Sequence, residues 1–166
     1  MLSLQCILID GTIWSLLLGV LILGSLWYNP RLWLHDYPAE IRAKVPPLTA
    51  REKRDQRLMM IPFFLLILGG PLYSAYLLKL QNGGSLSFTS AYLHIYLVAN
   101  IFNLFDALVL DLLILTFMKP NFAVIPGAEG MEYLYRDWGM HLKNYLKGIV
   151  IMAIFSLPLS AIAMIL

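Results

Sequence analysis

The chain has 166 residues, of which 60% are hydrophobic and only 13% are charged. Soluble domains carry about a quarter charged residues, and one small core cannot hide this much apolar surface, so the composition excludes an ordinary soluble domain. The formal net charge is only +2, and the chain lacks the dense basic surface with base-stacking aromatics that nucleic-acid binding needs, so we expect no nucleic-acid partner.

Four long apolar runs predict an all-α integral membrane protein. They cover 7–27, 58–79, 91–117 and 145–166, and each approaches or exceeds the roughly 20 residues that a helix needs to cross about 30 Å of hydrocarbon. A spanning backbone must satisfy its own hydrogen bonds, so helices are the expected form. No Lys or Arg precedes the first run and no small-residue cleavage site follows it, so we expect a retained helix. One membrane domain, 1–166, accounts for the chain.

The positions of the basic residues predict the orientation in the membrane. Most Lys and Arg residues lie in the two long connections, 28–57 and 118–144. Basic loops stay in the cytoplasm, so the sequence predicts both connections inside and both termini outside (N-out/C-out). The same charges would attract anionic lipid headgroups.

The first connection and the second span carry three local signals. Four aromatic residues suit the cytoplasmic interface: Trp27, Tyr28, Trp33 and Tyr37. The sequence Thr49-Ala-Arg-Glu52 matches a capping box, which predicts a helix that starts there and runs into the second span. Gly69-Gly70-Pro71 predicts a kink or break within that span, with a hinge that lines a cavity as the alternative.

The second connection predicts a fifth, interfacial helix. At about 100° per residue, one arc of the segment 131–145 holds its apolar residues: Met131, Leu134, Tyr135, Trp138, Leu142 and Tyr145. This pattern is typical of an amphipathic helix that lies in the membrane interface. We expect it to turn into the fourth span.

Polar side chains form a stripe along the third span: Tyr92, Tyr96, Asn100, Asn103, Asp106 and Asp111. Lipid-facing helix surfaces do not tolerate such a stripe, so we expect it to face the bundle interior or a water-filled cavity. Two interpretations remain open. The stripe either binds a ligand or forms hydrogen bonds that hold the helices together.

A weaker signal suggests a metal or acid–base site at the cytoplasmic surface. Asp137, His141 and Asn144 follow i, i+4, i+7 spacing, and Asp111 and Glu129 could approach them. The alternative is that Asp137 and His141 are ordinary polar residues of a surface helix. There is one His and no HExxH pair, and no motif identifies a catalytic residue or a cofactor.

The remaining isolated polar groups are expected to be structural. Asp10 lies near the outer end of the first span, where headgroup water would reach it, and pairing with an interior donor is the alternative. His94 lies off the polar sector near the outer interface, and His35 belongs to the aromatic segment. The single cysteine, Cys6, excludes an intramolecular disulfide.

The stretch NLFDALVLDLLILTFMKPNFAVIPGAEG contains D-x4-D, Lys-Pro and Ile-Pro-Gly-x-Glu-Gly. In this C-terminal part the chain resembles small bacterial four-span membrane proteins whose activity is uncharacterised. The resemblance implies the bacterial cytoplasmic (inner) membrane and no particular activity. It also marks residues for testing: Asp106, Asp111, Pro126, Gly127 and Glu129.

The leading hypothesis is a multi-pass membrane protein with a polar pocket open to the cytoplasm. The pocket would bind a small solute, cation or lipid headgroup, and the protein would be a transport or accessory subunit in a homo-oligomer or with a membrane-protein partner. Asp106 would be the principal ligand, with Asn103 and Asn100 beside it and Asp111 with Glu129 at the mouth. The alternatives are a metal-dependent enzyme acting on lipid or isoprenoid phosphate, and an assembly partner of another membrane protein.

Overall fold

Four long helical spans form the molecule, in agreement with the predicted all-α four-span fold. The computed structural model describes residues 2–166. Each span is long and apolar enough to cross a membrane, at 25, 32, 31 and 28 residues. They are α1 (Leu4–Tyr28), α3 (Ala50–Gln81), α4 (Phe88–Phe105) continued by the π-helix η2 (Asp106–Met118), and α5 (Trp138–Ile165).

The outer surface of the bundle is suited to lipid. Only 17% to 33% of the most apolar stretch of each span is buried inside the protein. Large apolar side chains such as Val20, Leu65 and Val150 are therefore exposed along the spans. An apolar surface of this extent matches hydrocarbon rather than water, so the chain is a multi-pass membrane protein.

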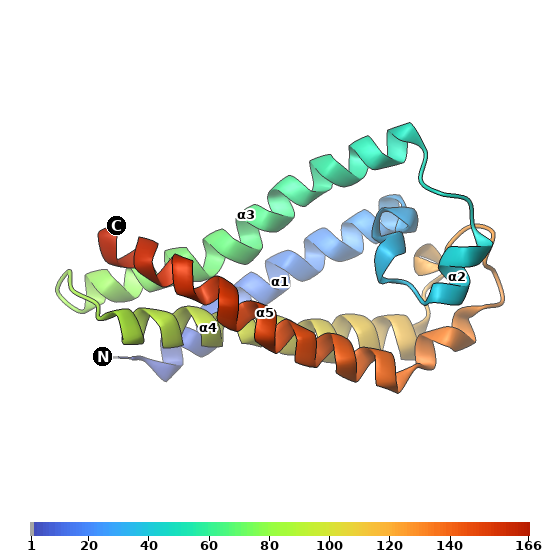
Figure 1. Ribbon diagram of the computed structural model, residues 1–166. Helices are drawn as coiled ribbons and strands as arrows, with labels where there is room; N and C mark the ends of the chain where they lie inside the picture. The colour runs from blue at the N-terminus through green and yellow to red at the C-terminus, as the bar shows by residue number, and fades with distance from the viewer. Residues whose placement is uncertain (1) are drawn as a thin grey trace.

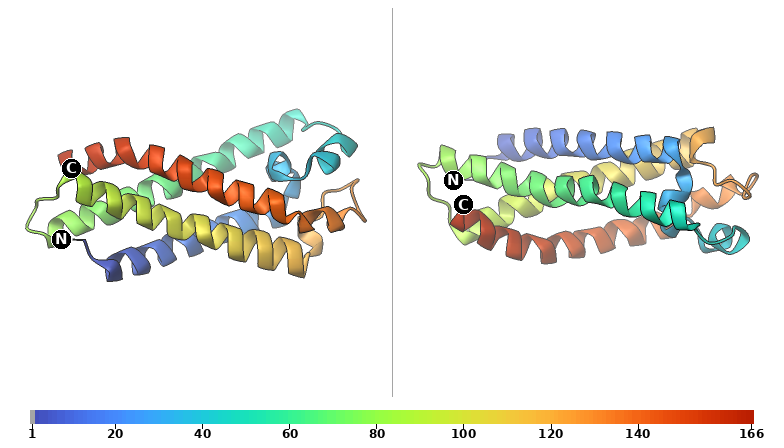
Figure 2. Two further views of the ribbon diagram at one scale, coloured as in Figure 1. Left: turned by 60° about the horizontal axis from the view of Figure 1, so that its bottom comes forward. Right: turned by 90° about the horizontal axis from the view of Figure 1, so that it is seen from above.

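The elements divide between two ends of an elongated bundle (Figures 1 and 2). Both termini and the α3–α4 turn lie at one end, which we call the terminal end. The short elements lie at the opposite, loop end: η1 (Pro30–Asp36), α2 (Ala39–Lys44), η3 (Asn121–Ala123) and η4 (Glu132–Arg136). α1 packs against α3 and α4, and α5 packs against α4 and α3.

The predicted capping box of the second span is confirmed. The Glu52 backbone N–H donates to Thr49 Oγ1 at 3.2 Å, and the Thr49 N–H donates to the Glu52 carboxylate at 2.7 Å. This exchange satisfies donors at the helix start. α3 therefore begins at Ala50, before the apolar run that defines the span in sequence.

Of the predicted kink or break at Gly69-Gly70-Pro71, the break does not occur, because α3 runs without interruption from Ala50 to Gln81, and the kink stays a prediction. Gly70 instead packs against the ring of Trp14, so close that an added Cβ would overlap the indole. The absence of a side chain at Gly70 therefore allows α3 to pack closely against Trp14 of α1.

The segment predicted as one interfacial helix is divided in two. η4 ends at Arg136, and α5 begins at Trp138 and continues directly into the fourth span. The division lies at Asp137, whose carboxylate accepts a hydrogen bond from the Met140 N–H at 3.0 Å. This N-cap fixes the start of α5, so no separate amphipathic helix precedes the span.

The third span changes its helical form at Asp106. α4 is α-helical to Phe105, and the following residues to Met118 form a π-helix. At its end the Lys119 N–H donates to the carbonyl of Ile114, five residues earlier, at 2.9 Å, which is the hydrogen-bond spacing of a π-helix. π-helical turns are rare and often occur at functional sites. The α-helical wheel used on the sequence therefore applies only up to Phe105.

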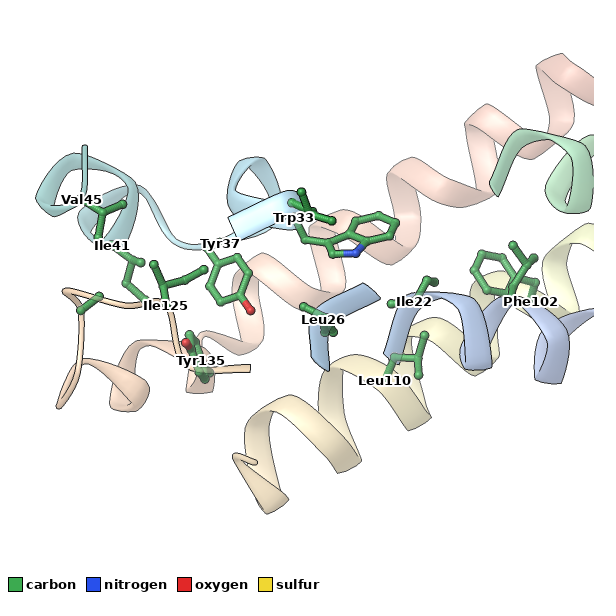
Figure 3. Close-up of a cluster of buried hydrophobic side chains, with 13 residues drawn as sticks. Ile22, Leu26, Trp33, Tyr37, Ile41, Val45, Phe102, Leu110, Ile125 and Tyr135 are labelled. Atoms are coloured by element: carbon green, nitrogen blue, oxygen red, sulfur yellow. The ribbon is translucent and has the colours of Figure 1, made fainter. Parts of the chain in front are cut away.

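At the loop end the two long connections pack together as one layer, which we call the cap (Figure 3). The Tyr37 hydroxyl donates to the Ala123 carbonyl at 2.7 Å, which joins the first connection to the second. The Trp33 indole N–H donates to Ser25 Oγ at 2.7 Å, which ties η1 back onto α1. The cap thus covers the ends of α1 and of the third span.

The predicted aromatic cluster divides between two environments. Trp27 and Tyr28 are exposed near the end of α1, as expected for interface residues. Trp33 and Tyr37 are buried in the cap because η1 folds back over the bundle.

Candidate functional site

A cavity of about 390 Å³ lies at the loop end, beneath the cap. Its walls come from the end of α1, from η1, from the third span and from the first half of α5. Phe63 of α3, Tyr135 of η4 and the two residues after η1, Tyr37 and Pro38, complete the lining. Apolar side chains make up much of the wall, and five ionisable side chains other than tyrosine line it: Asp36, Asp106, Asp111, His141 and Lys147.

Asp106 stands at the first residue of the π-helix and lines the cavity. Within the described chain, residues 2–166, its carboxylate makes no hydrogen bond or ion pair. An unpaired carboxylate in a membrane-spanning segment is costly. Asp106 is therefore the group of this cavity that most needs a partner.

Asp111 pairs with His141 across the third span and α5. His141 Nδ1 lies 3.2 Å from Asp111 Oδ2, and the side chains are only 25% and 11% exposed for Asp111 and His141. His141 Nε2 faces the Tyr135 carbonyl at 2.7 Å. Both ring nitrogens thus face oxygen acceptors, so the geometry favours a proton on each nitrogen and an imidazolium–carboxylate pair.

Asn103 has two roles that the sequence left as alternatives. Its side chain lines the cavity, and its Nδ2 donates to the Tyr145 carbonyl of α5 at 3.1 Å. The close approach of α4 and α5 at this point requires Gly148, where an added Cβ would overlap the Asn103 amide. Asn103 therefore joins the helices and also presents an amide to the cavity.

Sequence reasoning missed Asp36 and Lys147 as cavity residues. Asp36 ends η1, and Lys147 lies on α5. Loss of hydration around Asp36, together with repulsion from Asp111, raises its pKa, although His35, Lys147 and Arg42 act in the opposite direction. The available signal was the carboxylate of Asp36 within the aromatic segment WLHDY. It indicates a cavity residue only once η1 is known to fold back over the bundle.

Asn100 does not line the cavity. Its amide donates to the Tyr96 carbonyl of the same helix at 2.8 Å. The buried face of α4 is rotated from the predicted one and consists of Ala91, His94, Ile95, Val98, Ala99, Phe102 and Asn103. Tyr92, Tyr96 and Asn100 therefore lie at the edge of this face, where Tyr92 and Tyr96 stack with ring centres 6.0 Å apart.

Glu129 and Asp137 also lie outside the cavity. Glu129 is exposed in the second connection, where its carboxylate accepts from the Gly127 N–H at 3.0 Å. Asp137 is occupied as the N-cap of α5. Of the metal candidates, only Asp111 and His141 are in contact. No three His, Cys, Asp or Glu side chains among residues 2–166 are arranged to hold a metal ion, so the proposed four-residue metal site is not assembled.

The cavity lining combines acidic polar groups with apolar side chains. Its carboxylates outnumber its Lys and His side chains, and one carboxylate, Asp106, is unpaired. Ligand pockets for organic molecules have this character, with a largely apolar lining and a few fixed polar groups. Comparisons with protein-family models, curated proteins and solved structures find no match to the chain.

Proposed function

We propose that this protein binds a small organic cation in the loop-end cavity, as a transport or accessory protein of the bacterial cytoplasmic membrane. If the basic connections lie inside, as basic loops do, the cavity is on the cytoplasmic side. The ligand would place its charge at Asp106 and its apolar body against the apolar lining residues.

The unpaired carboxylate of Asp106 is the observation that carries this proposal. Within a membrane span, an ammonium or similar group at Asp106 would offset the cost of this partly buried negative charge. The other carboxylate of the third span, Asp111, already has His141 as its partner. Asp106 is thus free to recognise a ligand without disrupting an existing ion pair.

An organic cation fits this cavity better than a bare metal ion. Metal ions require several ligands that converge on one point, and the described chain offers no such cluster. The apolar lining, which includes Ile22, Leu26 and Ile151, suits a hydrocarbon body. Phe63 and Phe102 add aromatic rings that can attract a cation by its charge.

Binding of a matched pair of compounds would test the proposal. Benzyltrimethylammonium carries a quaternary charge, and neopentylbenzene has the same shape without it. We expect the purified protein in lipid nanodiscs to bind the cation at least about tenfold more tightly than the neutral compound, a difference of about 1.4 kcal/mol. Isothermal calorimetry and ligand-observed NMR would measure both affinities.

Two charge-removing variants complete this experiment. Asp106→Asn keeps the side-chain shape and should lower the affinity for the cation to that for the neutral compound. Glu129→Gln removes a carboxylate that lies outside the cavity, so it should leave both affinities unchanged. Equal binding of the two compounds by the wild-type protein, or full binding by Asp106→Asn, would refute the proposal.

A further inference from the structure

A second polar cluster joins three spans in the terminal half of the bundle. Ser74 Oγ of α3 lies 2.5 Å from Asp10 Oδ2 of α1 and 2.6 Å from His94 Nε2 of α4. His94 and Ser74 are 0% and 1% exposed. The sequence suggested separate structural roles for Asp10 and His94, whereas the fold connects them through one hydroxyl.

The cluster lies inside the spans but close to the terminal end. Asp10 and His94 are each six residues from the start of their helices, and Ser74 is seven residues from the end of α3. At 1.5 Å per residue these positions are all about 10 Å from the helix ends. Asp10 is only partly buried, whereas His94 and Ser74 are buried, so Asp10 is the member of the cluster most accessible from outside the bundle.

The cluster can exist in two protonation states that differ by one proton. Ser74 has a single hydroxyl hydrogen to share between Asp10 and His94. If Asp10 is ionised and His94 is neutral, the hydroxyl donates to Asp10 and His94 Nε2 must carry its hydrogen and donate to Ser74. His94 Nδ1 is then bare, and the cluster has a charge of −1.

One added proton makes the cluster neutral, and two arrangements place a hydrogen on His94 Nδ1. In the first, His94 becomes an imidazolium next to ionised Asp10. In the second, Asp10 is protonated and donates to Ser74, Ser74 donates to Nε2, and the neutral ring carries its hydrogen on Nδ1. In the structure Nδ1 is the one buried side-chain nitrogen or oxygen among residues 2–166 that has no hydrogen-bond partner.

No fixed positive charge neutralises the cluster in its unloaded form. α1 has no charged residue other than Asp10, and α4 has none besides the titratable His94. On α5 no Asp, Glu, Lys or Arg follows Lys147. Lys79 of α3 donates to the Met164 carbonyl at 2.8 Å, at the terminal end of the bundle. A lone negative charge within a span is costly, and one proton removes it.

We propose that the Asp10–Ser74–His94 cluster is a proton-binding site, which takes up one proton from the terminal side through Asp10 and holds it with His94 Nδ1 protonated. The site is separate from the loop-end cavity. Between them lies a tightly packed layer in which Gly70 contacts Trp14 and Gly11 contacts Ile101. This inference therefore does not depend on the proposed cation binding.

Nitrogen NMR of ¹⁵N-histidine-labelled protein in lipid nanodiscs tests this site, because protonated and bare ring nitrogens have well-separated shifts. The chain has three histidines, so the signal lost in His94→Gln identifies His94. As the pH falls from about 9 to about 5, a range in which histidine charge commonly changes, His94 Nδ1 should pass from bare to protonated in one step.

Removing the negative charge should weaken proton binding. Asp10→Asn should shift the His94 step down by at least about one pH unit, a tenfold loss of affinity. Ser74→Ala breaks the bridge while keeping both titratable groups, and should shift the step in the same direction. Asp106→Asn, in the other polar site, should leave it unchanged.

Two results would overturn the proposal. One is a His94 Nδ1 signal that keeps the same protonation state throughout this pH range. The other is a step that is unchanged in both folded variants, Asp10→Asn and Ser74→Ala. Neither result depends on ligand binding in the cavity, so this proposal and the proposed function can fail separately.

Discussion

Asn103 of α4 donates a hydrogen bond to the Tyr145 carbonyl of α5 at 3.1 Å, and this bond positions one wall of the cavity. Gly148, one turn further along α5, leaves the space that the amide occupies. The cavity and the helix packing are therefore coupled through one polar contact, and substitutions there should affect both.

Gly148→Ala should destabilise the protein by about 1–3 kcal/mol, because the new methyl group would overlap the Asn103 amide and force α4 and α5 apart. Denaturant unfolding in detergent micelles would measure the loss. Gly24→Ala is the matched control, since no atom lies within 4 Å of a Cβ at that position. It should be neutral or slightly stabilising, as expected for Gly to Ala in a helix. Equal effects of the two variants would contradict the close contact.

Gly70→Ala and Gly69→Ala should differ although the residues are adjacent. A Cβ at Gly70 would overlap the Trp14 ring, whereas one at Gly69 meets no atom within 4 Å. We expect a loss of about 1–3 kcal/mol for Gly70→Ala alone, with a change in Trp fluorescence. If Gly69→Ala were the more damaging variant, α3 would have to face α1 differently from the structure.

The Asp111–His141 pair should contribute measurable coupling energy. Its side chains are mostly buried, so a double-mutant cycle with Asp111→Asn and His141→Gln should give a coupling of about 1–3 kcal/mol. The His35–Asp36 pair has the same chemistry and the same 3.2 Å separation, but its side chains are 52% and 58% exposed. A cycle with His35→Gln and Asp36→Asn should give well under 1 kcal/mol. Similar coupling in both cycles would contradict the assigned burial.

The stabilities of Asp36→Asn and Glu129→Gln, each measured relative to wild type, should change in opposite directions with pH. Loss of hydration raises the pKa of Asp36 although its side chain is 58% exposed, so its contribution is small because solvent screens it. That contribution is complete below the unfolded-state pKa and is lost as the pH rises through the folded-state pKa. The stability of Asp36→Asn relative to wild type should therefore improve as the pH rises from the unfolded-state pKa of Asp36 to its folded-state pKa.

The Gly127 N–H lowers the pKa of Glu129, so its contribution is present above its unfolded-state pKa and disappears as the pH falls through its folded-state pKa. The deficit of Glu129→Gln should therefore shrink in acid, by a small amount because Glu129 is exposed. Melting temperatures of both variants and wild type between about pH 3 and pH 8 would check both signs. Parallel curves for wild type and Asp36→Asn would contradict the raised pKa.

Much of the fold could be predicted from the sequence because the bilayer imposes a simple length requirement. Four apolar runs indicated four spans, and Thr49 with Glu52 indicated where α3 begins. Asp106, Asn103 and Asp111 could be identified as site candidates because they are polar residues within an apolar run. All three line the cavity.

The remaining features depend on contacts between distant parts of the chain. A helical wheel indicated a polar face on α4, but close packing of small residues such as Ala91 and Ala99 decided which face is buried. The buried face includes His94 and leaves Asn100 at its edge. Asp36 reaches the cavity only because Tyr37 and Trp33 hold η1 against Ala123 and Ser25. No local pattern in the sequence encodes those pairings.

The cap has a consequence for biogenesis. Its two halves belong to connections that precede the second and fourth spans, and the Tyr37–Ala123 hydrogen bond can form only after both have been synthesised. The cavity wall also needs α5, which leaves the ribosome after the other three spans. A nascent chain that has inserted only its first three spans therefore has no enclosed chamber, and the proposed ligand could be recognised only once α5 docks.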